Sequence, residues 1–342
     1  MTLRFAALGI DHFHIFDHIE GLIAAGAEFA GYAEVGGSSR IIAGVGKTWP
    51  DAPVLTQEQI LNDASIQVVC NASVPADRAD MAITAMRHGK DVMIDKPGAT
   101  TLDQIAALRT CVAETGRIFS ICFSERLIVR AAERAAKLIA EGAIGRVVQT
   151  LGIGPHRLNR KIRPDWFFDP ERYGGILNDI ASHQIDQFLF YTGSTTGEIV
   201  ASTVGNYGNP DDPGLQDFGQ ILLKSDRATG YVRVDWFTPD ALPTWGDGRL
   251  TILGTEGYIE LRKYVDVAGR EGGDHLFLVN KDRCEHIDCS GDALSYFTNF
   301  IADVRDRTET AMPQEHVFEV SRLAVEAQRR ADDLTPASEA RA

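Results

Sequence analysis

The sequence predicts an α/β domain followed by a domain with a large, mostly antiparallel, open β-sheet and helices on one face. Short apolar runs alternate with helical patterns in the first third of the chain, which is typical of βαβ units and a parallel sheet. The second half holds β-rich segments separated by Gly, Pro, Asp and Asn. A chain of 342 residues, 44% of them hydrophobic, can form two domains of about 150 residues each. We expect them at residues 1–121 and 122–342.

Strands and helices alternate in the first domain. Apolar runs predict strands at residues 3–8, 28–33, 68–70 and 91–94, and helical periodicity predicts helices at residues 15–25, 76–87 and 102–113. Ligands of parallel sheets bind beyond the carboxyl ends of the strands. Gly9, Glu34, Asn71 and Lys96 each lie at or just after such an end, so we expect them to face one crevice.

The composition excludes several classes of protein. A net charge of −14 argues against partners such as nucleic acid and anionic membrane surfaces. No apolar run approaches the ~18 residues of a membrane span, and the first one is too short for a signal peptide. The five cysteines are odd in number and form no Cys-x-x-Cys pair. We therefore expect free thiols in a cytoplasmic protein.

The first predicted turn departs from the dinucleotide-binding loop Gly-x-Gly-x-x-Gly, whose glycines let the backbone approach a diphosphate. Residues 9–14 read Gly-Ile-Asp-His-Phe-His, so only the first glycine is kept. The strand–turn–helix context remains, and Glu34 stands about 20 residues further on, where a carboxylate would bind the ribose hydroxyls. The candidate cofactor-binding residues here are Gly9, Ile10, Asp11, His12 and Glu34.

The same segment allows a metal-dependent hydrolase as an alternative. His12, His14 and His18, with Asp17 between them, offer the ligand types that zinc prefers. If residues 14–18 are helical, however, His14 and His18 share a face while His12 lies in the preceding turn. No later cluster of His and Asp completes a binuclear site. We therefore expect no metal, and a capping and cleft-lining role for these side chains beside a cofactor.

In the second domain, β-rich segments predict strands at residues 147–153, 200–206, 218–223, 228–236, 249–253 and 258–261. One sheet face, with Tyr231, Val234 and Trp236 among its candidate members, is too apolar to remain exposed. A final helix is expected at residues 315–330, before a polar tail, residues 335–342, that we expect to be mobile.

Asp179, His183 and Asp186 fall on one stripe of a predicted helix. The opposite side is apolar, so this helix has the pattern of a cleft wall. The preceding stretch, residues 155–173, combines basic groups with aromatic rings. It suits a sugar or polyol, whose C–H faces stack on rings while the hydroxyls bind polar groups. The alternative is a surface loop anchored by Trp166 and Phe167, and both interpretations stay open.

Two long motifs resemble the Gfo/Idh/MocA family of NAD(P)-dependent oxidoreductases. Residues 85–97 read A-M-R-H-G-K-D-V-M-I-D-K-P and resemble the family segment A-L-x-x-G-K-x-V-x-x-E-K-P, with Asp95 in place of Glu. Residues 174–186 are similar to its helix G-G-x-L-x-D-x-x-x-H-x-x-D. Residues 123–126, 141–145 and 254–257 resemble the family's domain junction and a turn of its C-terminal sheet. The reduced glycine loop, and the lack of Pro-x-x-x-His after the fourth strand, are departures.

The resemblance implies a Rossmann domain that binds NAD, with NADP as the alternative, and a homo-oligomer, dimer or tetramer, formed through the C-terminal sheet. The implied residues are Gly9, Ile10, Asp11, His12, Glu34, Asn71, Ser73, Asp95 and Lys96 for the cofactor; Lys96, Asp179 and His183 for catalysis; and Arg126, His156, Arg160, Trp166, Asp179 and His183 for the substrate.

The expected reaction is hydride transfer between the nicotinamide and a secondary alcohol of a sugar, inositol or related polyol. His183 would act as general base, Lys96 would stabilise the alkoxide, and Asp179 would orient the alcohol or tune His183. Three alternatives differ in kind. They are a glycoside-cleaving enzyme that uses tightly bound NAD for transient oxidation, the metal-dependent hydrolase with His12, His14 and His18, and a non-catalytic binding protein. The last is disfavoured because all three catalytic residue types are present.

Overall fold

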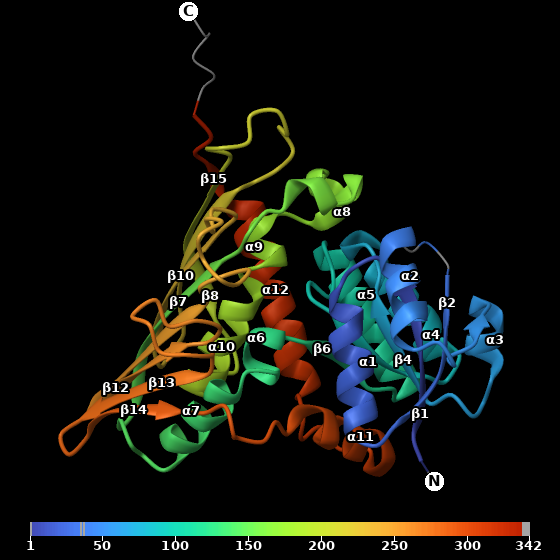
Figure 1. Ribbon diagram of the computed structural model, residues 1–342, viewed down its shortest axis with the longest axis horizontal. Coiled ribbons are helices and arrows are strands. Elements are labelled where there is room, and N and C mark those ends of the chain that lie inside the picture. Colours follow the sequence, from blue (N-terminus) through green and yellow to red (C-terminus); the bar gives the residue numbers. More distant parts are fainter. Residues whose placement is uncertain (1, 35, 37, 337–342) are drawn as a thin grey trace, which may run out of the picture. The chain divides into compact units, whose positions relative to one another are not determined.

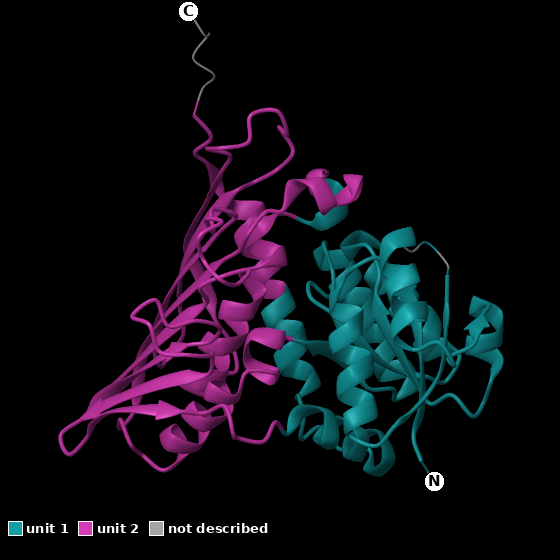
Figure 2. Ribbon diagram, in the orientation of Figure 1, with its two compact units in different colours: residues 1–122, 171–174, 295–321 teal, residues 123–170, 175–294, 322–342 magenta. Residues whose placement is uncertain are grey.

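The computed structural model describes residues 2–34, 36 and 38–336. These form two compact units (Figure 2). The described residues within 2–122, 171–174 and 295–321 make the first, and residues 123–170, 175–294 and 322–336 make the second. Most of the tail predicted to be mobile, residues 335–342, lies outside the described residues. None of the described helices is long and apolar enough to cross a membrane.

The first unit contains a parallel sheet, as predicted (Figure 1). Within the described residues its strands are β1 (Arg4–Ile10), β2 (Glu28–Ala33), β3 (Val54–Leu55), β4 (Val68–Ala72), β5 (Asp91–Asp95) and β6 (Phe119–Cys122), and their order in the sheet is β3-β2-β1-β4-β5-β6. Every pairing is parallel. The chain therefore proceeds from β1 toward β2 in one direction and from β4 toward β5 in the other. The adjacent strands β1 and β4 form the switch point at which sheets of this class bind ligands.

Helices connect these strands: α1 (His14–Ala24), α2 (Ser39–Thr48), α3 (Gln57–Asn62), the 3-10 turn η1 (Pro75–Asp77), α4 (Arg78–Arg87) and α5 (Leu102–Thr115). Thr101 caps the start of α5 through a reciprocal pair of hydrogen bonds with Gln104. The left-handed Gly116, φ 63°, ends it. α11 (Tyr296–Asp306) also belongs to this unit, and the Tyr296 hydroxyl lies 2.9 Å from the Ser120 hydroxyl on β6.

The second unit contains a larger sheet that is mostly antiparallel. Its described strands are β7 (Val147–Pro155), β8 (Glu198–Gly205), β9 (Phe218–Lys224), β10 (Thr229–Asp235), β11 (Arg249–Gly254), β12 (Gly257–Arg262), β13 (His275–Asn280), β14 (Cys284–Asp288) and β15 (Asp332–Asp333). They lie in the order β14-β13-β12-β11-β7-β10-β9-β8-β15. Only the pairs β7–β10 and β8–β15 are parallel among those described. The six strands predicted from the sequence are confirmed, with ends shifted by one or two residues.

Helices of the second unit cover one face of this sheet (Figure 1). They include α6 (Ser124–Leu127), α7 (Arg130–Ala140), α9 (Ile176–Asp179) and α10 (Ser182–Thr192), while α8 (Pro170–Tyr173) and α12 (Gln314–Arg330) contain residues of both units. Ala135 and Leu138 of α7 pack into a buried cluster with Ile252, Ile259 and Leu278 of the sheet. This apolar layer holds the helices on the sheet.

Two predictions about this unit were wrong. The helix expected to carry Asp179, His183 and Asp186 is interrupted, because α9 ends at Asp179 and α10 begins at Ser182. Asp186 is fully buried and forms an ion pair with Arg126 at 2.6 Å. It therefore does not line a cleft, since the guanidinium already compensates its charge in the interior.

The apolar face of the sheet also differs from the prediction. Val234 and Trp236 are buried, because alternate residues of a strand point to opposite faces. Tyr231 belongs to the other face, where its register partners Leu151 and Leu222 are 41% and 43% exposed. This exposed row continues to Leu253 and Tyr258 on the neighbouring strands, which are 41% and 40% exposed. The second unit thus presents an apolar surface on its open sheet face.

Candidate functional site

Gly9 lies in the last part of β1 and has φ +83°. A Cβ atom at this position would lie 2.8 Å from Asn71 Oδ1 and 2.8 Å from Ser73 Cβ. Asn71 is itself held in place, because its Oδ1 accepts the Ser73 amide at 2.8 Å. Both the left-handed backbone and the lack of space therefore require glycine, and this part of the predicted loop has the close approach expected of a dinucleotide site.

The residues after Gly9 tie β1 to β4. Ile10, the fully buried last residue of β1, is followed by Asp11 and His12, whose amides both donate to the Ala72 carbonyl at 3.0 Å. Asp11 is only 6% exposed, and burial raises its pKa to about 6. Glu34, directly after β2, is exposed. Its carboxylate is free to meet a ligand at the same edge of the sheet.

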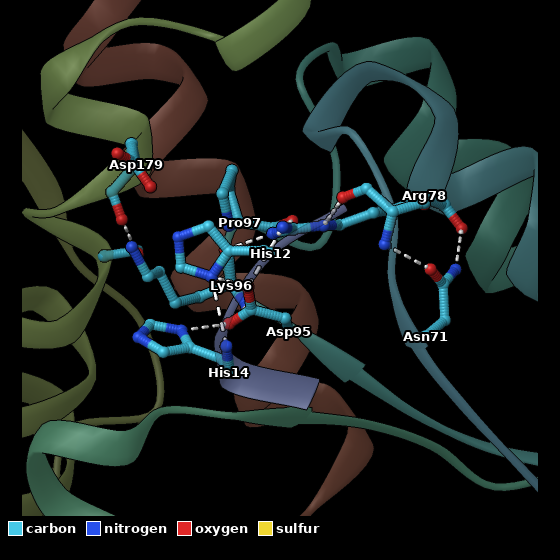
Figure 3. Close-up of polar contacts among 10 residues, drawn as sticks. His12, His14, Asn71, Arg78, Asp95, Lys96, Pro97 and Asp179 are labelled. Carbon is cyan, nitrogen blue, oxygen red and sulfur yellow. Dashed lines mark hydrogen bonds and ion pairs between the residues drawn. The ribbon is translucent and has the colours of Figure 1, made fainter. Parts of the chain in front are cut away.

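A buried carboxylate organises the end of β5 (Figure 3). Asp95 is fully buried, and its Oδ1 accepts from the Lys96 amide and from His14 Nδ1, each at 2.8 Å. Its Oδ2 lies 3.1 Å from His12 Nδ1 and 2.9 Å from the guanidinium of Arg78. Burial opposes ionisation, but His14, Arg78 and His12 outweigh it and hold the pKa of Asp95 well below its usual range. The ionised carboxylate thus fixes both imidazoles through Nδ1.

Arg78 was not predicted from the sequence. It is 1% exposed and donates through Nε to the Ser73 carbonyl at 2.7 Å and through Nη1 to the carbonyl of Pro97 at 3.2 Å and to that of Lys96. It therefore joins the segments that follow β4 and β5. The sequence signal that could have pointed to it is an arginine at the start of a helix, six residues after the end of β4.

The metal alternative can be compared with this geometry. Ligand atoms of His12, His14 and Asp95 lie within 4.8 Å of one another, the only such group among the described residues. Each Asp95 oxygen, however, already has two hydrogen-bond donors. One of the donors to Oδ2 is the guanidinium of Arg78, whose positive charge would repel a metal cation. His18 is not in the group. It is 1% exposed, burial lowers its pKa to about 4, and neither ring nitrogen has a hydrogen-bond partner among the described residues. The predicted trio of histidines is therefore not assembled.

In the second unit, Asp179 and His183 are 8% and 1% exposed. Asp179 ends α9, and His183 lies in the first turn of α10 with its ring 6.4 Å from that of Phe123. Arg163 lies over the rings of Phe167 and Trp236, at 4.4 and 5.0 Å from their centres. Burial lowers the pKa of this arginine, while Asp179 opposes the shift. Both catalytic candidates of this unit are thus buried, His183 beside the Phe123 ring and Asp179 within electrostatic reach of Arg163.

The stretch before α9 has the buried aromatic anchor of the surface-loop interpretation, and the substrate role of its polar groups stays a prediction. Phe167 is 2% exposed and acts as an anchor, and the His156 ring lies 4.5 Å from that of Trp245. The Trp166 indole nitrogen is buried with no hydrogen-bond partner among the described residues. Arg160 is bound to Asp212 by two hydrogen bonds of 2.5 and 2.6 Å. Of these candidates, Arg160 already has an anionic partner.

Arg126, another predicted substrate-binding residue, also has an anionic partner. Its guanidinium makes two hydrogen bonds, of 2.6 and 2.7 Å, to the Asp186 carboxylate, and it lies 4.1 Å from the centre of the Phe190 ring. Both charged partners are buried. The described contacts of Arg126 are therefore those of a structural anchor for α10.

A second buried ion pair lies beneath α10 and was also missed. Lys263 Nζ lies 2.6 Å from Glu125 Oε2, which also accepts from Gln184 at 2.9 Å. Lys263 donates further to Gln187 Oε1 at 3.0 Å. Although burial opposes ionisation, Lys263, then His183 and His156, lower the pKa of Glu125 to about 2. This pair places a fixed charge within electrostatic reach of His183.

Comparisons with known proteins agree with the architecture. Residues 43–123 match the NAD-binding Rossmann fold of an oxidoreductase family, and residues 132–260 match the GFO/IDH/MocA C-terminal domain. A solved structure of a putative oxidoreductase from Erwinia carotovora atroseptica SCRI1043 is 46% identical, with a TM-score of 0.94, over 97% of this chain and 100% of that chain. The chain belongs to the Gfo/Idh/MocA family.

Curated relatives in this family are more distant. A 1,5-anhydro-D-fructose reductase of Ensifer adhaerens is 28% identical over 49% of this chain and 49% of its own length. A scyllo-inositol 2-dehydrogenase (NAD(+)) of Bacillus subtilis (strain 168) is 25% identical over 62% of this chain and 58% of its own. The chain therefore spans about half the length of the curated relatives it matches.

The NAD-binding fold implies a dinucleotide, and the residues of the first unit fit one. The closely packed Gly9, the switch point between β1 and β4 and the exposed Glu34 are the features that such a cofactor requires. The other two glycine positions of the loop carry Asp11 and His14. At these two positions a side chain stands where a glycine would let the backbone approach a diphosphate.

Proposed function

We propose that this Gfo/Idh/MocA protein is an NAD(P)-dependent oxidoreductase acting on a secondary alcohol of a sugar, inositol or related polyol. The observation that carries the proposal is the position of Lys96, which is 4% exposed and follows Asp95 at the carboxyl end of β5 in a family NAD-binding domain. The curated relatives named above are a reductase and a dehydrogenase, and they support this reaction class.

The dinucleotide, when bound, supplies the hydride acceptor for the oxidation of the alcohol. Lys96 stabilises the negative charge that develops on the alcohol oxygen. His183 takes the proton from the hydroxyl, and Asp179 orients the alcohol or tunes His183. In this division of roles, residues 1–121 bind the cofactor and residues 122–342 bind the substrate and mediate self-association.

NAD is the preferred cofactor in this proposal. The exposed carboxylate of Glu34 after β2 suits the ribose hydroxyls and repels a 2′-phosphate. Ser38, Ser39 and Arg40 follow closely and could receive that phosphate instead. The ratio of kcat/KM for NAD and NADP decides between them, and comparable values would show that the later residues prevail.

The exposed apolar row on the open sheet face supports a homo-oligomer, dimer or tetramer. The five cysteines, none of them in a disulfide, support a cytoplasmic enzyme. The net charge of −14 argues against binding to nucleic acid and anionic membranes. Light scattering of the purified protein measures the oligomeric state. A monomer at micromolar concentration would contradict the role given to the sheet face.

A screen of NAD and NADP reduction with sugars, anhydrosugars and inositols tests the reaction. Lys96→Ala should lower turnover on the substrate found by about 10²–10⁴-fold with the fold intact, because charge stabilisation of the transition state is lost. Lys224→Ala, at an exposed lysine of β9, is the matched control and should be within twofold of the parent. A Lys96→Ala turnover within tenfold of the parent would refute the assignment. Cofactor that stays bound, with product formed but no net NADH, would indicate the glycoside-cleaving alternative.

A further inference from the structure

The side chain of Asp11 lies at the switch point of the parallel sheet. Its backbone amide donates to the Ala72 carbonyl of β4, and its carboxylate accepts from the backbone amide of Val74. The carboxyl group therefore bridges the ends of β1 and β4. Dinucleotides bind in the crevice at such a point, with the diphosphate at the start of the following helix.

Asp11 also occupies a defined position of the binding loop. Counted from Gly9, it stands where the second glycine of Gly-x-Gly-x-x-Gly allows the backbone to approach the diphosphate. This chain puts an acidic, 6% exposed side chain there. An ionised carboxylate and a diphosphate at one site repel each other, and the repulsion is strongest where water is excluded.

The charged groups around Asp11 do not remove this repulsion. No ion pair within 4 Å involves Asp11 in the described part of the chain. Arg78 lowers its pKa, but that guanidinium is bound to Asp95 at 2.9 Å. Arg172 lowers it only weakly and lies 3.3 Å from Asp77, whose carboxylate acts in the opposite direction. Burial dominates and raises the pKa of Asp11 to about 6.

The neighbouring imidazole supplies no positive charge in the free protein. Burial, followed by the proximity of His14, lowers the pKa of His12 to about 3. His12 is therefore neutral at physiological pH. Of these two adjacent residues, Asp11 is the one whose pKa lies closer to physiological pH.

We propose that binding of the dinucleotide takes up a proton at Asp11, whose neutral carboxyl then donates a hydrogen bond to the diphosphate. The proton comes from solvent, and no covalent bond is made or broken. The inference rests on the proposed function, because it presumes that the protein binds NAD. It makes Asp11 a determinant of cofactor affinity that responds to pH.

The affinity for NAD⁺ should fall as the pH rises, because cofactor binding and proton binding at Asp11 are linked. Above the pKa of free Asp11, each unit of pH weakens NAD⁺ binding by up to about tenfold, until the higher pKa of the complex is reached. Well below that pKa, Asp11 is already protonated and the affinity levels off. In Asp11→Asn, the amide is neutral at every pH and can still donate, so binding should not depend on pH.

Isothermal titration calorimetry with NAD⁺ tests the proposal. Dissociation constants are measured from pH 5.5 to 8.5, and at pH 7.5 in three buffers of different ionisation enthalpy, which report the protons taken up. The parent should take up about 0.5–1 proton at pH 7.5. Asp11→Asn should take up essentially none and bind NAD⁺ at least about tenfold more tightly than the parent at pH 8. Glu198→Gln, at an exposed carboxylate of β8 in the second unit, is the matched control and should keep the linkage. His12→Asn, which removes the neighbouring imidazole, should still take up the proton.

Three outcomes overturn the inference. The parent could bind NAD⁺ without proton uptake, Asp11→Asn could keep the parent's pH dependence, or His12→Asn could abolish it. If Asp11→Asn fails to fold, Asp11→Gly, which restores the glycine of the loop, should give the same flat profile. Absence of NAD⁺ and NADP⁺ binding by the parent and both Asp11 variants at every pH would refute the proposed function, and the inference with it.

Discussion

Asp11 of the first unit and Glu125 of the second are both buried carboxylic acids, 6% and 1% exposed, yet their pKa values move in opposite directions. Burial raises the pKa of Asp11 to about 6, whereas the pKa of Glu125 falls to about 2. The difference is a cation at close range. Lys263 Nζ lies 2.6 Å from Glu125, and Asp11 has no comparable partner in the described chain.

The comparison shows that burial alone does not set the charge of an acidic side chain. A carboxylate with a directly bonded ammonium group is a permanent charge, suited to holding helices and orienting neighbouring groups. A carboxyl group without one remains close to its titration point and can respond to a ligand. The same residue class therefore serves as a fixed anchor in one unit and as a titratable group in the other.

The largest expected effect comes from removing the cation. Lys263→Met should leave the Glu125 carboxylate buried without its partner and lower the free energy of unfolding by about 3–5 kcal/mol at pH 7. Urea denaturation followed by tryptophan fluorescence measures it, since Trp166, Trp236 and Trp245 all lie in the second unit. A loss below about 1 kcal/mol would contradict the role of the pair.

The pH dependence of the same variant sharpens the test. In the parent, Glu125 contributes stability above its unfolded pKa of 4.5, and this contribution is lost as the pH falls toward about 2. In Lys263→Met the carboxylate can be neutralised by protonation, so the difference from the parent should shrink between pH 7 and pH 4. Glu125→Gln/Lys263→Met, which removes both charges, should be more stable at pH 7 than Lys263→Met alone.

An intermediate effect on stability, with a pH dependence opposite to that of Glu125, is expected from Asp11. Its pKa rises from 3.8 to about 6 in the folded protein, so stability is highest below pH 3.8 and falls as the pH rises to about 6. Asp11→Asn removes this penalty and should increase the free energy of unfolding at pH 8 by on the order of 2 kcal/mol. Circular dichroism at pH 8 and pH 4 measures the change, and an equal effect at both pH values would contradict it.

The smallest effect is expected at the surface. Lys224 and Glu198 form an ion pair at 3.2 Å with side chains 50% and 63% exposed. Lys224→Met is the exposed counterpart of Lys263→Met and should change the free energy of unfolding by less than about 1 kcal/mol. A loss as large as that of Lys263→Met would mean that exposure does not explain the difference between the two pairs.

The elements that were predicted correctly are those with a strong local pattern. β1, β2, β4 and β5 are apolar runs bounded by turn residues, and their positions were confirmed within two residues. The two-residue β3 is too short to have a period. β6, which is fully buried, and α11, which buries one face in the first unit, were not predicted. Their place in the first unit depends on tertiary packing, which a local sequence pattern does not predict.

The candidate site likewise contains residues that a local pattern predicts and residues that only the fold brings together. The position of Lys96, and Gly9 as the one glycine of the loop motif that this chain keeps, follow from strand ends and the family motifs. Asp95 is separated in sequence from His12 by 83 residues and from His14 by 81. Glu125 and Lys263 are 138 residues apart. Such pairs are made by the fold and have no local signature. Val234 and Trp236 were assigned to the wrong face because both faces of β10 carry aromatic or branched side chains.

The late segment of the first unit has a consequence for biosynthesis. Residues 295–321 supply Tyr296, whose hydroxyl meets Ser120, and Gln314, whose side chain accepts the Phe119 amide at 2.9 Å. These partners are synthesised only after strands β7 to β14 of the second unit. Until residues 295–321 have been synthesised, residues 1–122 therefore lack α11 and the first part of α12, which pack on them in the folded unit. A fragment that stops at residue 122 would lack these contacts, and we expect it to be less stable than the same unit in the whole chain.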